Sequence, residues 1–160
     1  TSDITSSGYI HNSRALPLAK LNRLSKRNLY GNSLTLSNDN TSVVFTKEPF
    51  NESKHTIERD TDGWLEAIDG QKPWGVDGCI PTTGLASITI NYKDKTYSLP
   101  EVAISNIYEP SFLEGQCGVF VGSDNTLYIA MVNGDGAGSY IVIWSIADKE
   151  LKSMNLIIPF

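Results

Sequence analysis

Few residues in this chain of 160 amino acids have the types and settings that nucleophilic or acid–base catalysis needs. Both histidines, His11 and His55, lie in polar stretches without helix or strand periodicity, and no GxSxG motif is present. A catalytic triad needs a histidine held beside its nucleophile, and a zinc site needs local spacing such as C-x₂₋₄-C. Because neither pattern occurs, the sequence predicts a protein that is not an enzyme and holds no cofactor. Carboxylates that could attack a glycosidic bond, such as Asp77 with Asp135, have no spacing that fixes their separation.

One group of carboxylates partly matches a calcium-binding loop. Glu58, Asp60, Asp62 and Gly63 match positions 1, 3, 5 and 6 of an EF-hand loop, and Asp69 falls at position 12. Alternating carboxylates can direct several oxygens at one hard cation, although glutamate at the first position and aspartate at the last depart from the pattern. The alternative is a polar turn that its aspartates cap, and this is the favoured interpretation. The calcium candidate therefore consists of Glu58, Asp60, Asp62 and Asp69.

The two cysteines, Cys79 and Cys117, are candidates for a disulfide. Their number is even, and each has a glycine beside it in a turn-like setting. One bridge would fit an oxidising compartment and would contribute about 3–4 kcal/mol in the loop-entropy model. Two unrelated buried thiols are the alternative. We predict the disulfide, and with it a periplasmic or cell-envelope location, the cytoplasm being the alternative.

The aromatic residue with the most suggestive setting is Trp74. It lies in the segment Asp69–Gly84, which is rich in glycine and proline and long for a structureless connection. Tryptophan and tyrosine dominate the hot spots of protein interfaces, so Trp74 is a candidate anchor for a partner. The alternative is that Trp74 folds back over the sheet edge. Adding residues from the glycine-rich segment Gly134–Gly138 and its flank, the predicted partner-binding set is Trp74, Asp77, Asp135 and Tyr140.

Charge is unevenly distributed along the chain. The net charge is −5, but five basic residues and no acidic ones lie between Arg14 and Arg27, so the remainder carries −10. An acidic body argues against nucleic acid as a partner, because phosphate contacts need a basic surface, and suits a basic protein better. Mild acidity that only maintains solubility is the alternative. No apolar run approaches the roughly 18–20 residues that span a bilayer, so no membrane insertion is expected.

The elements that position these residues are predicted to be mainly strands. Residues 1–15 are expected to form a flexible arm, and residues 16–160 a single β-rich domain. Leucines at helical spacing predict a short helix within Leu16–Leu29. Four strands in the C-terminal part are joined by two to five residues, which implies an antiparallel meander. The predicted fold is mainly β, an antiparallel sandwich or half-open barrel with one short N-terminal helix. The predicted strands are Ser33–Ser37, Thr41–Thr46, Trp64–Ile68, Ala86–Tyr92, Thr96–Leu99, Gly118–Gly122, Thr126–Asn133, Ser139–Ala147 and Glu150–Ile157.

Several segments resemble a group of small bacterial proteins of unassigned function. The resemblance spans about residues 64–147 and rests on Ile68–Pro81, Leu99-Pro100, Tyr108-Glu-Pro110, and Asn133–Tyr140 with Trp144. Small bacterial β-domains of this kind often are immunity proteins that neutralise a toxin. The resemblance implies a non-catalytic binding protein that blocks a secreted bacterial toxin. The alternative is an envelope or periplasmic protein that binds a small molecule or glycan.

Overall fold

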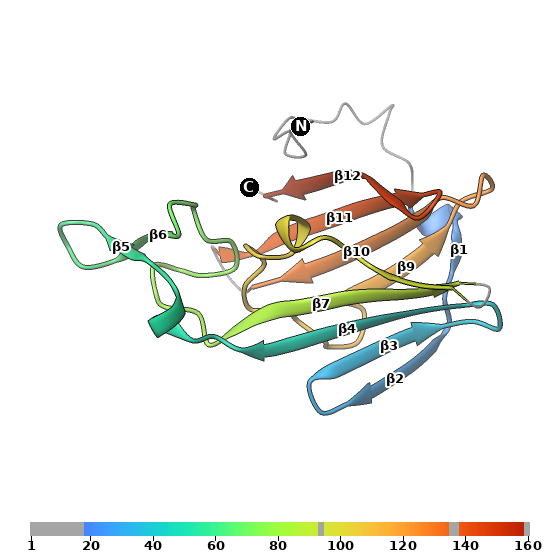
Figure 1. Ribbon diagram of the computed structural model, residues 1–160, viewed down its shortest axis with the longest axis horizontal. Coiled ribbons are helices and arrows are strands. Elements are labelled where there is room, and N and C mark those ends of the chain that lie inside the picture. Colours follow the sequence, from blue (N-terminus) through green and yellow to red (C-terminus); the bar gives the residue numbers. More distant parts are fainter. Residues whose placement is uncertain (1–17, 93–94, 135–137, 159–160) are drawn as a thin grey trace.

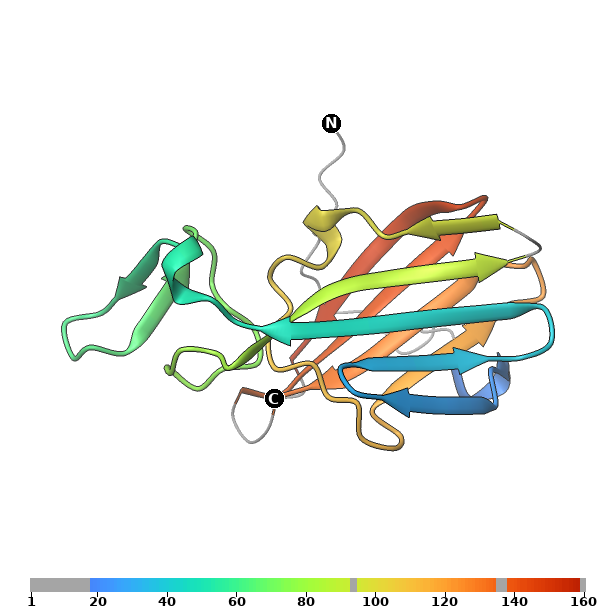
Figure 2. The ribbon, with the colours of Figure 1, turned by 60° about the horizontal axis from the view of Figure 1, so that its bottom comes forward.

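The computed structural model describes residues 18–92, 95–134 and 138–158. Within them, two five-stranded antiparallel sheets pack face to face, and a two-stranded hairpin projects beyond one end (Figures 1 and 2). The mainly β, antiparallel sandwich predicted from the sequence is therefore confirmed, and the described strands do not close into a barrel. The predicted N-terminal arm, residues 1–15, lies outside the described residues.

The first sheet contains the predicted C-terminal meander. Its order is β1 (Asn22–Arg23), β9 (Cys117–Val121), β10 (Leu127–Asn133), β11 (Tyr140–Ala147) and β12 (Glu150–Ile157). The second sheet has the order β2 (Lys26–Tyr30), β3 (Ser33–Ser37), β4 (Thr41–Pro49), β7 (Thr83–Tyr92) and β8 (Lys95–Ser98). The projecting hairpin pairs β5 (Ile57–Arg59) with β6 (Leu65–Ile68). Three 3₁₀ turns complete the described elements: η2 (Leu18–Lys20), η3 (Glu52–Lys54) and η4 (Glu101–Ala103).

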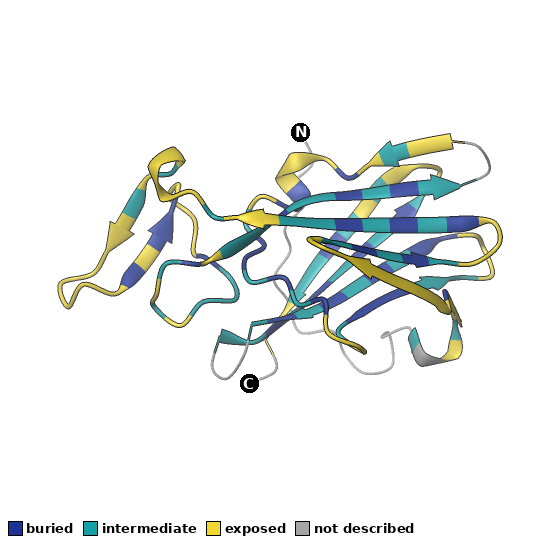
Figure 3. Ribbon diagram, turned by 90° about the horizontal axis from the view of Figure 1, so that it is seen from below, coloured by how far each residue is buried: buried dark blue, intermediate teal, exposed yellow. Residues whose placement is uncertain are grey.

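The main core lies between the two sheets. Every second residue of the central strands is buried, which is the period that a strand with one covered face requires (Figure 3). Val142 and Trp144 of β11 belong to the same buried cluster as Phe45 of β4 and Ile88 of β7. Fully burying one such side chain stabilises the fold by about 1.5–3 kcal/mol.

The helix predicted within Leu16–Leu29 is wrong. After the short η2 turn the chain forms β1 at the edge of the first sheet and then β2 at the edge of the second. Leu24 lies between these two strands, is buried in the main core, and donates its N–H to the carbonyl of Val119 at 2.9 Å. The leucine spacing therefore reflects a chain crossing from sheet to sheet, and asparagine and serine at Asn22 and Ser25 are weak helix formers. No helix in the described part of the chain is long and apolar enough to cross a membrane.

The connection between η4 and β9 is fixed to the first sheet by buried side chains. The Trp144 indole donates to the carbonyl of Ala103 at 2.9 Å, and the Tyr140 hydroxyl donates to the carbonyl of Tyr108 at 3.0 Å. Asn133 accepts the backbone N–H of Ser111 at 3.0 Å. These bonds satisfy polar groups that burial would otherwise leave unpaired, and so they determine where the connection lies.

Candidate functional site

A projecting acidic lobe, residues 51–82, lies at the end of the sandwich where β4 ends and β7 begins (Figure 1). It has a small core of its own around Leu65 and Ile68, and this core reaches the body of the protein at Tyr108. Phe50 joins the two parts, since its ring packs edge-on against Tyr108 with centroids 5.6 Å apart. The lobe is therefore a structured extension rather than a loose loop.

Asp69 connects the two strands of the lobe's hairpin. Its carboxylate accepts the N–H of Thr56 at 2.8 Å and lies 2.7 Å from Nδ1 of His55. The hydrogen bond with His55, followed by that with Thr56, holds the pKa of Asp69 below its ordinary value. His55 in turn stacks on Phe50 with ring centroids 4.7 Å apart. Asp69 is thus a structural group, with its oxygens used within the protein.

The carboxylates of the calcium candidate do not converge. Asp60 accepts the backbone N–H groups of Asp62 and Trp64, each at 2.9 Å, and so closes the tip of the hairpin. Glu58 is exposed on β5. The Asp69 carboxylate is used by the contacts with Thr56 and His55, which we call the Asp69 clamp. In the described residues no three histidine, cysteine or carboxylate side chains are grouped to hold a metal ion. The capped polar turn, the alternative stated above, is what forms.

Trp64 is the exposed aromatic residue of the lobe, and it is not among the binding residues predicted from the sequence. Its side chain is 56% exposed and lies against Gly78, where a Cβ would stand 2.8 Å from the indole. The carbonyl of Gly78 accepts the N–H of Leu65 at 2.8 Å, so strand and loop support the indole together. A signal was present in the sequence. Alternation along the predicted strand Trp64–Ile68 puts Leu65 and Ala67 on one face and Trp64 with Glu66 on the other, although Ile68 is also buried in the structure.

Trp74 fits the alternative interpretation better than the predicted one. It is only partly exposed, packs against the main core, and forms a parallel bridge with Ile107. The ammonium of Lys72 lies 5.7 Å from the centre of its ring. Trp74 therefore anchors the loop to the sandwich and shares only its remaining surface with solvent. Asp77, by contrast, is exposed. It precedes Gly78, the residue that lies against the Trp64 ring.

The two loops that the sequence singled out do meet. A Cβ on Gly134 would stand 3.1 Å from the Cα of Gly75, and one on Gly138 would stand 3.3 Å from the carbonyl carbon of Val76. Backbone therefore packs on backbone without side chains between the loops. Asp135 lies outside the described residues, so its place in this arrangement is a prediction only.

Tyr140 supports this contact from below. It is 1% exposed, and its hydroxyl accepts a hydrogen bond from the Asn133 amide at 3.1 Å while donating to Tyr108. Burial raises the pKa of its phenol above the ordinary value. With 1% of its surface exposed, Tyr140 offers almost no contact area to a partner, contrary to the expectation from the sequence. Its role is to position the two loops.

The disulfide prediction is also wrong. Cys79 is an exposed free thiol on the acidic lobe, whereas Cys117 is a buried free thiol in β9. The Cys117 thiol donates to the carbonyl of Ser111 at 3.1 Å, and burial raises its pKa to about 12. The two residues belong to different parts of the molecule, and the alternative of unrelated thiols holds.

Charge is concentrated on the acidic lobe. Residues 51–82 contain seven carboxylates and three lysine or arginine side chains, a balance of −4 in a chain of net charge −5. One lobe carboxylate is near a cation, since Glu52 lies 4.0 Å from Arg59. Four further carboxylates are exposed and have no ion-pair partner among the described residues: Glu58, Asp62, Glu66 and Asp77. Asp62 and Glu66 lie two residues before and after Trp64 in the sequence, and Asp77 precedes Gly78, on which the indole rests. Together the unpaired carboxylates make the lobe anionic.

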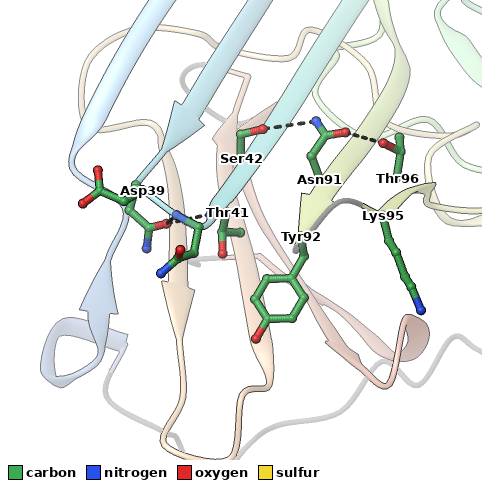
Figure 4. Close-up of a pocket in the computed structure, with 9 residues that line it drawn as sticks. Asp39, Thr41, Ser42, Asn91, Tyr92, Lys95 and Thr96 are labelled. Carbon is green, nitrogen blue, oxygen red and sulfur yellow. Dashed lines mark hydrogen bonds between the residues drawn. The ribbon is translucent and has the colours of Figure 1, made fainter.

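An open polar pocket of about 460 Å³ lies at the opposite end of the sandwich, between the β3–β4 turn and the start of β8 (Figure 4). Its central side chains bond to one another. Asn91 donates to Ser42 at 3.1 Å and accepts from Thr96 at 2.7 Å, and Asn38 accepts the N–H of Thr41 at 2.8 Å. Most of its polar groups are therefore already satisfied within the protein.

Comparisons with known proteins give no relative for this chain. No family model matches it, and neither a curated protein nor a solved structure is significantly similar. The resemblance to small bacterial immunity-type proteins therefore stays a prediction, and functional inference rests on the geometry of the described residues.

Proposed function

We propose that this protein binds a basic partner protein through its acidic lobe. The setting of Trp64 carries the proposal: an exposed indole, supported from below by Gly78, on a lobe with a charge of −4. Tryptophan is the residue most enriched in interface hot spots, and a rigid support lowers the entropy lost on binding. Unpaired carboxylates around it would steer a basic partner and select its orientation.

Within this proposal we retain the expectation of an immunity protein that blocks a secreted bacterial toxin. A toxin that acts on nucleic acid must bind phosphates and so needs a basic surface. An anionic lobe that carries an exposed aromatic residue is complementary in charge to such a surface. Occluding that surface requires no catalytic group of the protein itself.

The alternative function, binding of a small molecule or glycan, has weaker support. The partly exposed Trp74 is held by Lys72 and the core, and Tyr140 is buried, so these two residues do not line an open site together. The polar pocket at the other end is open, and its central groups are bonded internally. The predicted envelope location, without a disulfide to support it, stays a prediction.

The test uses the full chain as bait for secreted and intracellular proteins of its own organism. We expect the wild-type protein to capture a basic protein in a salt-sensitive manner, and Trp64→Ala to weaken binding by about 30-fold or more, the loss typical of a hot-spot residue. Asp77→Lys should weaken binding and reduce its salt dependence. Tyr30→Ala is the matched control, since Tyr30 is an 85% exposed aromatic on β2, in the body of the sandwich.

The captured protein, purified and expressed alone, should inhibit growth, and co-expression of the wild-type chain should restore it. If Trp64→Ala and Tyr30→Ala changed the affinity for the captured partner equally, the contact would lie elsewhere and the proposal would be overturned. If the captured partner is not toxic, the proposed binding surface would stand but the immunity function would be rejected.

A further inference from the structure

The two outer faces of the sandwich differ in chemical character. On the second sheet, most outward residues are hydroxyl or amide side chains: Asn28, Ser33, Thr35, Ser37, Ser42, Thr46, Ser87, Thr89 and Asn91. Val44 in the middle of that face, and Lys26 and Tyr30 on its edge strand β2, are the exceptions. On the first sheet the outward residues are mostly apolar. We call this set the apolar face: Phe120, Tyr128, Ala130, Val132, Ile141, Ile143 and Ile157.

The strand register makes the apolar face continuous. Phe120 is paired with Tyr128, and Ala130 with Ile143. These two pairs belong to two neighbouring rows across the strands, and a third row runs from Val132 through Ile141 to Ile157. Cross-strand neighbours on one side of a sheet are in contact, so these rows form one surface across β9, β10, β11 and β12.

The inner residues of the same strands already fill the core, so the apolar face is not needed for it. Trp144 and Val142, which alternate with Ile143 and Ile141, are 0% exposed between the sheets. The outward residues are partly exposed instead. A sheet face that is solvated normally carries polar residues, as the second sheet does here. A contiguous apolar surface rimmed by polar residues is typical of a contact with another molecule.

We propose that the apolar face is the interface of a symmetric dimer, in which it packs against the same face of a second copy of this chain. A two-fold interface must be complementary to itself, and sheets with apolar faces satisfy this by packing about 10 Å apart. Charge argues for a copy rather than for the basic partner of the acidic lobe. Among the described residues, the centre of the face has no charged side chain, so nothing there attracts a basic protein.

The charges near the apolar face lie at its rim. The guanidinium of Arg23 stands 5.9 Å from the centre of the Phe120 ring at one edge, and Glu150 pairs with Lys152 at 2.7 Å near the other. Two chains of net charge −5 repel each other, but the acidic lobe that holds most of this charge projects beyond the strand ends (Figure 1). Face-to-face packing therefore leaves these charged groups at the edge of the contact rather than at its centre.

The size of the apolar face fits the centre of a dimer interface. Four strands spaced about 4.8 Å apart and three rows about 6.7 Å apart cover on the order of 400 Å² of sheet, and the seven residues of the apolar face occupy roughly 200 Å² of it. A stable interface buries about 800 Å² on each partner, with an apolar centre and a polar rim. The apolar face would supply that centre. Ser145, Ser153 and Asn155, which lie beside it on β11 and β12, would supply part of the rim.

Sedimentation equilibrium of the full chain from low micromolar to sub-millimolar concentration tests the proposal. We expect a dimer for the wild type and, for Ile143→Lys, an increase of the dissociation constant by about 100-fold or more, because a lysine in the centre would be desolvated without a partner. Val44→Lys is the matched control, since Val44 is an outward, partly exposed apolar residue on the opposite face. It should leave the dimer intact.

A second readout does not depend on the folding of a lysine variant. In a Cys79→Ser background, Ala130→Cys should be joined to its copy by a short bismaleimide, whereas Thr89→Cys on the polar face should not. A wild-type chain that stays monomeric at all concentrations overturns the proposal. So does a dimer that Ile143→Lys leaves intact, or one that both lysine variants weaken equally.

Discussion

Gly75 and Gly134 touch through bare backbone, with the Cα of Gly75 only 3.1 Å from where a Cβ of Gly134 would stand. This contact joins the base of the acidic lobe to the turn between β10 and β11. Tyr140 lies directly beneath it, since a Cβ on Gly75 would stand 2.9 Å from the Tyr140 ring. The position of the lobe relative to the sandwich is thus fixed where two glycines and a buried phenol meet.

Replacing Gly75 by alanine should destabilise the protein by about 2–4 kcal/mol. The new methyl group would stand 2.5 Å from the carbonyl oxygen of Tyr108, and Gly75 has a φ of 92°, which side chains rarely adopt. Overpacking costs about 1–3 kcal/mol and the backbone strain about 1 kcal/mol more. Urea unfolding measures the change.

Gly31→Ala is the control for that variant. Gly31 also has a positive φ, 54°, but no atom lies within 4 Å of its Cβ position. It should cost only the backbone strain, about 1 kcal/mol. If Gly75→Ala and Gly31→Ala lowered the free energy of unfolding equally, the close packing of Gly75 against Tyr108 and Tyr140 would contribute nothing to stability.

Tyr140→Phe should cost about 1–3 kcal/mol while leaving the core volume unchanged. The variant removes the donor to the Tyr108 carbonyl and the acceptor of the Asn133 amide, and leaves both buried groups without that partner. We expect faster hydrogen exchange at lobe amides such as that of Leu65, measured by NMR, together with lower stability. Tyr30→Phe, at an exposed site, should change stability by less than about 0.5 kcal/mol. Unchanged exchange in the lobe would show that Tyr140 does not position it.

How far the sequence predicts this structure depends on how local each signal is. The strands β3, β4 and β9 to β12 follow from alternating hydrophobic residues and from short turns, which act within a few residues. Asn38 shows such a turn directly, because its side chain accepts the N–H groups of Asn40 and Thr41. Strand β5 has a single partly buried residue, Ile57, and so too weak a pattern to be predicted.

The errors arose where long-range packing decides. Leu24 is buried because it crosses between the sheets, and that crossing depends on the Val119 backbone far along the chain. An even number of cysteines suggested a disulfide between Cys79 and Cys117. The sequence could not show that these two residues lie in different parts of the molecule. Trp64 was predictable in part, because alternation with Leu65 places it outward. The support of its ring by Gly78 was not, since it depends on tertiary contact.

Thiol titration of the native protein should find one reactive cysteine. Cys79 is exposed, so it should react with an aromatic disulfide reagent at once. Cys117 is 4% exposed and its pKa is raised to about 12, so at pH 8 it has almost no thiolate and no access to the reagent. The second equivalent should appear only in denaturant, and prior reduction should change neither count. Cys79→Ser should abolish the fast reaction. A pair of thiols that appears only after reduction would restore the disulfide.

The carboxylate of Asp69 should make the acidic lobe sensitive to acid. Its folded pKa lies below the ordinary value of 3.8, because His55 and the Thr56 N–H stabilise the ionised form. A carboxyl whose folded pKa is depressed contributes stability that is fully present above the unfolded pKa and is lost as the pH falls through the folded pKa. Protection of the Thr56 amide against hydrogen exchange should therefore fall as the pH drops below about 4.

In Asp69→Asn this protection should already be reduced at neutral pH and should not depend on pH in that window. Asp77→Asn removes one exposed charge from the same lobe and should leave Thr56 protection unchanged, which separates the clamp from a general effect of charge. Equal protection in wild type and Asp69→Asn at neutral pH would refute the clamp.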